Sequence, residues 1–220
     1  EAVRISTATG VATGTIALNV DASAVASNGL TIVGNAGVNV LTGSGLNDKL
    51  YGSTGNDTLN GGGGNDTLIG GLGSDIYIVD SSGDVVTEIL NTGTDTIKSY
   101  VSYTLPVNVD RLQLIGTADI NATGNTLINI LTGNDGNNSL SGGIGNDTLS
   151  GGAGNDTLAG DVGNDVFLIA HGADHDSGES IDGGNDTDTV RFTSTTANDT
   201  LVLNANDINL EAVRFSTATG

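Results

Sequence analysis

The stretch GGGGNDTLIGGLGSD, residues 61–75, combines closely spaced glycines with two aspartates, Asp66 and Asp75, that lie nine residues apart. Glycine inside a strand or helix costs roughly 0.5–1 kcal/mol relative to alanine. A folded chain therefore carries many glycines only where the backbone must adopt conformations that other residues cannot reach. This stretch predicts tight, recurring turns that each present a carboxylate.

The nine-residue unit recurs over much of the chain. Five units follow one another without insertion from Gly34 to Ile78, and five more run from Gly124 to Leu168. Their consensus is G-G-x-G-N-D-x-L-x, with Asp or Asn at position six and Leu, Tyr or Phe at position eight of every unit. A flexible linker would not keep an apolar residue at position eight throughout, so the pattern indicates a folded repeat.

Each unit is expected to form a tight turn followed by a short strand. Side chains alternate between the two faces of a strand, so the residue at position eight points inward and its polar neighbours point outward. Two units then complete one coil of eighteen residues, and successive coils stack at about 4.8 Å, the spacing of hydrogen-bonded strands. The predicted fold class is all-β, a parallel β-roll (a right-handed β-solenoid), with irregular β connectors.

The composition supports a thin core and bound cations. The 220 residues include 35 Gly, no Cys, Met or Trp, and only 3% aromatic residues, although 36% are hydrophobic. This balance favours a thin aliphatic core over a thick core or plain disorder. The formal net charge of −20 argues against nucleic acid and anionic membranes as partners and for bound cations. No apolar run approaches the roughly 18 residues of a membrane-spanning helix, and no signal peptide is visible.

Position six places a carboxylate at the same point of each coil. Carboxylates stacked about 5 Å apart repel one another unless a cation lies between them. Calcium fits this arrangement, because it takes six to eight oxygen ligands from carboxylates and carbonyls in flexible geometry. Magnesium requires a stricter octahedron, and zinc prefers His or Cys, which these turns lack. The sequence therefore predicts calcium, with several ions bound in the turns.

The candidate ligands are the position-six side chains and the carbonyl oxygens of the turn glycines. The side chains are Asp48, Asp57, Asp66, Asp75, Asp147, Asp156, Asp165, Asn39, Asn129 and Asn138. The carbonyl oxygens are those of Gly52, Gly55, Gly61, Gly62, Gly64, Gly70, Gly71, Gly73, Gly142, Gly143, Gly145, Gly151, Gly152, Gly154 and Gly163. Units on one edge of the roll lie eighteen residues apart, which predicts the pairs Asp48 with Asp66, Asp57 with Asp75, Asp147 with Asp165, and Asn138 with Asp156. Asn39 and Asn129 begin their runs, so we expect weaker sites there.

Four units, GGGGNDTLI, GGLGSDIYI, GGIGNDTLS and GGAGNDTLA, match the pattern G-G-x-G-x-D-x-U-x strictly, and the units at 43–51, 52–60 and 160–168 match it nearly. They resemble the RTX, or hemolysin-type calcium-binding, proteins. The resemblance implies a parallel β-roll, export by a type I secretion system and calcium-dependent folding outside the cell. The chain departs from the family pattern at Leu46 and Ile128 and where Asn replaces Asp.

A longer repeat frames the chain. EAVRISTATG, residues 1–10, recurs as EAVRFSTATG, residues 211–220, with nine of ten residues identical and an offset of 210 residues. We interpret the chain as one period of a tandem array, cut within a connector. The expected parts are a β connector from the preceding period, a first RTX block, a solenoid-like β bridge, a second RTX block and a β connector into the next period, at residues 1–33, 34–78, 79–123, 124–168 and 169–220.

Two further motifs have interpretations outside the repeat. HGADH, residues 171–175, places two histidines four apart but lacks the Glu of a zinc-binding H-E-x-x-H helix, so a solvated loop is expected. GGNDTDTVRF, residues 183–192, is similar to a nonapeptide with Asp188 at position six, which is either an extra calcium ligand or part of a strand-entry turn. No catalytic constellation is visible, and we expect no enzyme activity.

The expected function is that of a calcium-binding structural module in a large extracellular bacterial protein, such as a surface layer, sheath, filament or adhesin. It would be secreted or attached to the cell surface and would assemble with neighbouring copies of the same repeat, without nucleic acid or membrane insertion. The alternative is a calcium-dependent secretion and folding region of an RTX toxin or secreted hydrolase. Adhesion to sugar or ice ranks below both, because every NDT sequence adjoins a calcium turn.

Overall fold

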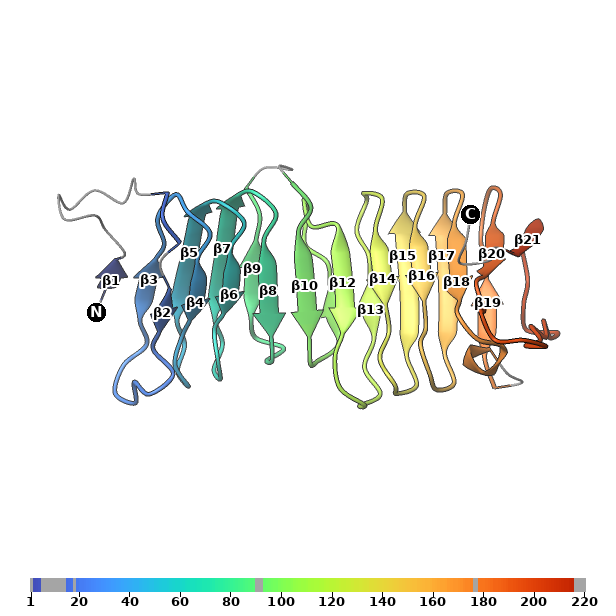
Figure 1. The fold of residues 1–220 in the computed structure, drawn as a ribbon, viewed down its shortest axis with the longest axis horizontal. Helices are drawn as coiled ribbons and strands as arrows, with labels where there is room; N and C mark the ends of the chain where they lie inside the picture. The colour runs from blue at the N-terminus through green and yellow to red at the C-terminus, as the bar shows by residue number, and fades with distance from the viewer. Residues whose placement is uncertain (1, 5–14, 18, 90–92, 176–177, 216–220) are drawn as a thin grey trace. The chain divides into compact units, whose positions relative to one another are not determined.

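A computed structural model describes residues 2–4, 15–17, 19–89, 93–175 and 178–215. Within these residues the regular structure is β, apart from the short 3-10 helix η1 (Gly172–Asp174). The chain divides into two compact units, one of residues 1–101 and 106–109 and the other of residues 102–105 and 110–220. Each unit is a parallel β-solenoid (Figure 1), which confirms the predicted fold class.

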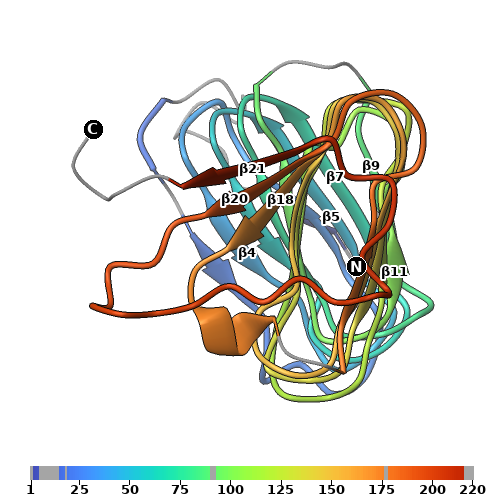
Figure 2. The same cartoon turned by 90° about the vertical axis from the view of Figure 1, so that its right-hand side faces the viewer.

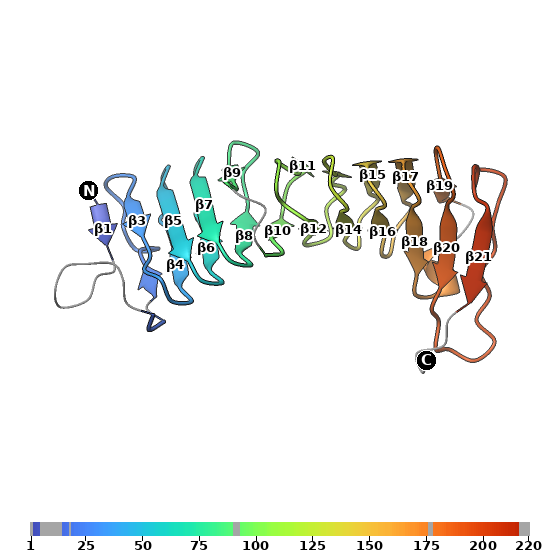
Figure 3. The ribbon, with the colours of Figure 1, turned by 90° about the horizontal axis from the view of Figure 1, so that it is seen from above.

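The first unit contains two parallel sheets between which the chain alternates. One sheet has the order β1-β3-β5-β7-β9 and the other the order β2-β4-β6-β8-β10. The strands are β1 (Ala2–Arg4), β2 (Val20–Asp21), β3 (Thr31–Val33), β4 (Val40–Thr42), β5 (Lys49–Thr54), β6 (Thr58–Asn60), β7 (Thr67–Leu72), β8 (Ile76–Val79), β9 (Val85–Thr87) and β10 (Thr96–Ser99). Figure 3 shows β5 and β7 stacked beside one another in one layer, with β4, β6 and β8 succeeding one another in the other.

The second unit repeats this construction. Its sheets have the orders β11-β13-β15-β17-β19 and β12-β14-β16-β18-β20-β21, and Figure 2 shows β18, β20 and β21 side by side. The strands are β11 (Tyr103–Thr104), β12 (Arg111–Leu114), β13 (Ala122–Thr123), β14 (Ile130–Thr132), β15 (Ser139–Ile144), β16 (Thr148–Ser150), β17 (Thr157–Val162), β18 (Val166–Ile169), β19 (Ser180–Asp182), β20 (Thr189–Phe192) and β21 (Ala212–Phe215).

The register follows the nonapeptide. Leu50 lies opposite Leu68, and Leu131 lies opposite Leu149, so each coil uses eighteen residues as predicted. All ten position-eight side chains are buried. Because the chain alternates between the two sheets, each run forms two inward-facing ladders: Leu41, Leu59 and Tyr77 facing Leu50 and Leu68 in the first run, and Leu131, Leu149 and Phe167 facing Leu140 and Leu158 in the second. The one apolar residue that faces inward from each short strand therefore builds the thin core.

The coils lengthen outside the nonapeptide runs. Ile76 of β8 pairs with Thr96 of β10, and Val166 of β18 pairs with Thr189 of β20, which are offsets of 20 and 23 residues. The extra residues lie between β9 and β10 and between β18 and β19, and the strands still add to the sheets in parallel. None of the described helical structure is long and apolar enough to span a membrane.

Candidate metal centre

Position six directly precedes a strand, and its carboxylate links two coils. One oxygen, Oδ1, accepts a hydrogen bond from the backbone N–H of the position-six residue one coil earlier. The structure thereby places the four expected pairs together, with N–Oδ1 distances of 2.7 Å for Asp48 with Asp66, 2.6 Å for Asp57 with Asp75, 2.7 Å for Asp147 with Asp165 and 2.8 Å for Asn138 with Asp156. The carboxylates therefore form a ladder along each edge of a solenoid.

The second carboxylate oxygen distinguishes six members of this ladder. These six residues are at most 2% exposed, and their Oδ2 atoms are buried and accept no hydrogen bond. They are Asp57, Asp66, Asp75, Asp147, Asp156 and Asp165. A buried charged oxygen without a partner is strongly unfavourable. A bound cation would supply the missing interaction at each of them.

Backbone carbonyl oxygens lie close to the unpartnered Oδ2 atoms. A Cβ added at Gly142 would lie 2.6 Å from Asp147 Oδ2 and 2.7 Å from the carbonyl oxygen of Gly160, one coil further on. The first glycine of the unit therefore leaves a space flanked by a carboxylate and a carbonyl from different coils. Hard oxygen donors of both kinds, without nitrogen or sulfur, fit calcium.

The other predicted turn glycines have a conformational role. Ten of them have a positive φ, which only glycine adopts readily: Gly55, Gly62, Gly64, Gly71, Gly73, Gly143, Gly145, Gly152, Gly154 and Gly163. Five stand at the first position and lie against a position-six carboxylate instead: Gly52, Gly61, Gly70, Gly142 and Gly151. Ser53 and Asp161 occupy second positions with φ of 88° and 73°, so the turn tolerates exceptions.

The first turns of each run are closed by the protein itself. The position-six side chain there accepts a hydrogen bond from the backbone N–H of position two in its own turn. The N–O distances are 2.8 Å at Asn39, 2.5 Å at Asp48, 2.7 Å at Asn129 and 2.8 Å at Asn138. In these turns the protein thus supplies a hydrogen bond from the same turn, which the Oδ2 atoms of the six Asp residues described above lack.

The ladder also contains acidic residues that the nonapeptide pattern did not reveal. Asp66, Asp75, Asp165 and Asp188 donate their backbone N–H groups to Asp84, Asp95, Asp188 and Glu211, at 2.9, 2.7, 2.8 and 2.6 Å. Asp188 is fully buried and its Oδ2 has no partner, which places it in the same environment as the predicted ligands. The signal in the sequence is an acidic residue directly before a short alternating strand. Asp84 keeps the regular offset of 18 residues from Asp66 but lies outside the nonapeptide run, whereas offsets of 20 and 23 residues hide Asp95 and Glu211.

Burial raises the pKa of Asp57, Asp66 and Asp165 in the ladder and that of Glu88. Desolvation is the largest cause, opposed by the backbone hydrogen bonds and reinforced by neighbouring carboxylates. The pKa of Asp57 rises to about 6, those of Asp66 and Asp165 to about 7, and that of Glu88 to about 8. Without a cation, the folded state therefore retains protons that the unfolded chain has lost.

This shift predicts that protons and calcium compete. Because the folded pKa values exceed the ordinary value of 3.8, the metal-free fold is most stable at acid pH and loses stability as pH rises from about 4 to about 7. A proton on these carboxyls therefore partly replaces calcium, so we expect the β signal of the calcium-free chain, followed by circular dichroism, to grow as the pH falls from about 7.5 to about 5. The calcium concentration at half-folding should fall with it, and a midpoint that rises as the pH falls would contradict the raised pKa values of these carboxyls.

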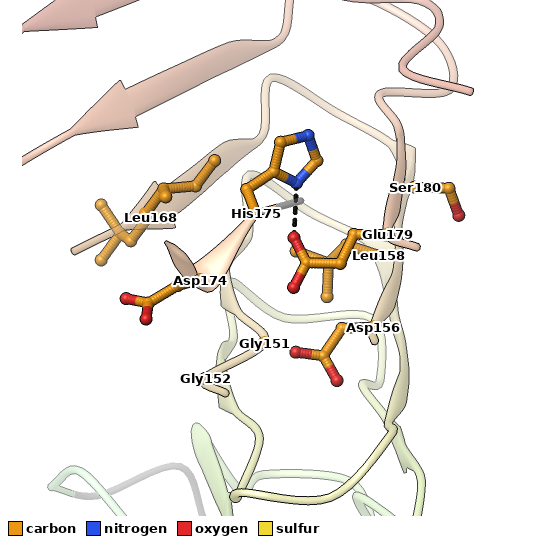
Figure 4. A pocket seen from close by; sticks show the side chains of 10 residues that line it. Gly151, Gly152, Asp156, Leu158, Leu168, Asp174, His175, Glu179 and Ser180 are labelled. Carbon is orange, nitrogen blue, oxygen red and sulfur yellow. Dashed lines mark ion pairs between the residues drawn. The ribbon is translucent and has the colours of Figure 1, made fainter. Parts of the chain in front are cut away.

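The histidine motif behaves differently from the sequence interpretation. The side chain of His171 is 55% exposed, as a solvated loop requires, but His175 is buried. His175 contacts Glu179 Oε2 through Nδ1 at 2.8 Å (Figure 4) and Asp207 Oδ2 through Nε2 at 2.9 Å. The solvated-loop interpretation is therefore wrong for His175, because its partners lie as far as 32 residues away and give no local signal.

Comparison with known proteins agrees with this geometry. The profile of the RTX calcium-binding nonapeptide repeat (four copies) matches residues 42–77 and 123–167. These ranges contain the six Asp residues with unpartnered Oδ2 atoms. A search of curated proteins with the chain finds no match.

Proposed function

Because the chain carries RTX calcium-binding nonapeptide repeats in a β-solenoid, we propose that it is a calcium-dependent structural module of a large extracellular bacterial protein. The protein would be a surface layer, sheath, filament or adhesin, secreted or held at the cell surface. The module would be unfolded at low calcium inside the cell and would fold after export. RTX repeat proteins are generally secreted, which supports this localisation.

One observation carries the proposal. The aspartates of the repeat bury an oxygen that no protein group satisfies, and they do so coil after coil. Calcium is thus part of the fold over much of both units, as expected of a scaffold that assembles where calcium is plentiful. Extracellular modules bind calcium with dissociation constants on the order of 10⁻⁴–10⁻³ M. A module with such affinity would bind calcium outside the cell but not at the low calcium concentration of the cytosol.

A structural role is favoured over an enzymatic one. The chain has no Cys, and among the described residues the buried histidine, His175, is held between Glu179 and Asp207. The carboxylates of the ladder are buried and accept hydrogen bonds from backbone N–H groups. The alternative, a secretion and folding region of a toxin or hydrolase, predicts a parent gene with a catalytic domain and a single copy of the 210-residue period. Many tandem copies would support the structural role.

The last strand of the second unit supports assembly with neighbouring copies. β21 lies at the edge of its sheet, and its side chains Val213 and Phe215 are 40% and 75% exposed. Phe215 also packs edge-to-face on Phe192, with ring centroids 6.1 Å apart. An exposed apolar edge strand is a template for pairing with another chain. We propose the next copy of the repeat as its partner.

This proposal predicts calcium-dependent self-association of the chain. With saturating calcium, light scattering should report particles that grow with protein concentration, and chelation should disperse them. Val213→Lys should weaken association, because a charge on an edge strand opposes pairing. Val202→Lys is the matched control, since Val202 is 60% exposed outside any strand. A strictly monomeric calcium-loaded chain at high concentration would refute the proposed partner.

A further inference from the structure

Three acidic side chains converge in the first unit, at the end of the first nonapeptide run. Asp75 precedes β8, Glu88 follows β9 and Asp95 precedes β10. Each offers one carboxylate oxygen, and these three atoms lie within 4.8 Å of one another. The three side chains are 0%, 4% and 1% exposed, so the cluster is enclosed by protein.

Glu88 makes this cluster different from a nonapeptide turn. In the regular turns, first-position glycines lie opposite each other, as Gly52 and Gly70 do next to the pair Tyr51 and Ile69. One coil later, Ile69 pairs with Thr87, which puts Glu88 opposite Gly70. A glutamate thus stands where the repeat calls for glycine. Gly70 gives it room, because a Cβ there would collide with the carboxylates of Asp75 and Glu88 and with the hydroxyl of Tyr77.

The partners of these carboxylates leave two oxygens unsatisfied. Asp75 Oδ1 accepts the N–H of Asp57, and Asp95 Oδ1 accepts the N–H of Asp75 at 2.7 Å. Glu88 Oε1 accepts the Tyr77 hydroxyl. Asp75 Oδ2 and Glu88 Oε2 are buried without a hydrogen bond, and among the described residues no basic side chain forms an ion pair with Asp75 or Glu88.

We propose that Asp75, Glu88 and Asp95 bind a calcium ion in a site made of side-chain carboxylates, which joins the last position-six aspartate of the first run to two carboxylates outside the nonapeptide units. Oxygen-only donors with three formal negative charges suit a hard divalent cation, and calcium tolerates irregular geometry better than magnesium. Glu88 and Asp95 both belong to the coil between Asp75 and Asp95, which is 20 residues long instead of 18. The ion therefore links two parts of this longer coil at the end of the first run of repeats.

Tyr77 provides a direct test, because it is buried and its hydroxyl contacts Glu88. Terbium replaces calcium at oxygen sites and emits when a nearby tyrosine is excited; the chain has no Trp, so tyrosine is the sensitiser. We expect calcium-displaceable, tyrosine-sensitised emission from the whole chain, and loss of most of it in both Glu88→Gln and Tyr77→Phe. Glu88→Gln should also bind one calcium fewer by equilibrium dialysis, whereas Tyr77→Phe should keep the wild-type count.

Asp135→Asn is the matched control, because it removes an exposed carboxylate of the other unit that does not stand at position six, and it should retain the emission. Unchanged emission in Tyr77→Phe, or an equal loss in Asp135→Asn, would overturn the proposal. If Glu88→Gln does not fold, Tyr77→Phe still tests the site, because this variant keeps the buried aromatic ring and loses only the hydroxyl. Calcium-induced folding of the wild type without Tyr77-dependent emission would reject this site alone; no calcium-induced folding would reject the proposed function.

Discussion

Removal of calcium is expected to unfold most of the β-solenoid. At neutral pH the six ladder aspartates with unpartnered Oδ2 atoms must be either protonated or repelled by one another, and the chain carries a formal net charge of −20. The cost of ordering 35 glycines adds to this repulsion. Far-ultraviolet circular dichroism of the metal-free chain should therefore show mainly coil.

Calcium should restore the β signal cooperatively, with a midpoint on the order of 10⁻⁴–10⁻³ M. Magnesium at the same concentration is the control, and we expect it to restore much less signal because it keeps its water shell and requires near-octahedral geometry. Equal β content with chelator and with calcium would show that the carboxylate ladder folds without a cation, against this prediction.

Gly73→Ala is expected to be among the most damaging of the conservative substitutions in the turns. Gly73 has a φ of +132°, and an added Cβ would overlap the carbonyl oxygen of Gly55 in the preceding coil. Backbone strain at such a position costs about 1–3 kcal/mol, and the overlap with a backbone atom adds to it because neither coil can move without breaking its ladder. We expect the free energy of unfolding in saturating calcium to fall by at least about 2 kcal/mol, which is the middle of the range for backbone strain alone.

Urea unfolding measures this loss, and Gly45→Ala supplies the control. Gly45 also lies in a nonapeptide turn, but its φ is not in the left-handed region and a Cβ there meets no atom within 4 Å. A surface change of this kind usually alters stability by less than about 0.5 kcal/mol. If the two variants have the same stability, the close stacking of successive turns is not what limits the fold.

The repeat itself could be predicted from the sequence because its information is local. Leu59 and Leu68 are fully buried, as the alternation within each unit predicts, and the eighteen-residue register between Asp48 and Asp66 follows from two units per coil. A nine-residue unit contains its own turn, its own strand and its own inward-facing side chain. Each element of the prediction therefore rests on residues that are neighbours in the chain.

The connectors could not be predicted in the same way. Asp95 and Glu211 continue the ladder at offsets of 20 and 23 residues, which depend on loop lengths that no periodicity specifies. For Asp188 the nonapeptide-like stretch left two alternatives open, and the structure places it in the ladder. His175 is buried because Glu179 and Asp207 surround it, and only the folded chain brings Asp207 close.

The sequence by itself determined the β-roll, its core residues and the calcium-binding character of its turns, because glycine conformation and strand alternation act within nine residues. The tertiary structure decided which oxygens need a cation. Asn39 and Asp48 are satisfied by N–H groups of their own turns, whereas Asp57 and Asp66 each keep a buried oxygen without a partner. The difference arises because the hydrogen bonds available to a carboxylate are set by the backbone that the adjacent turn and the adjacent coil place against it.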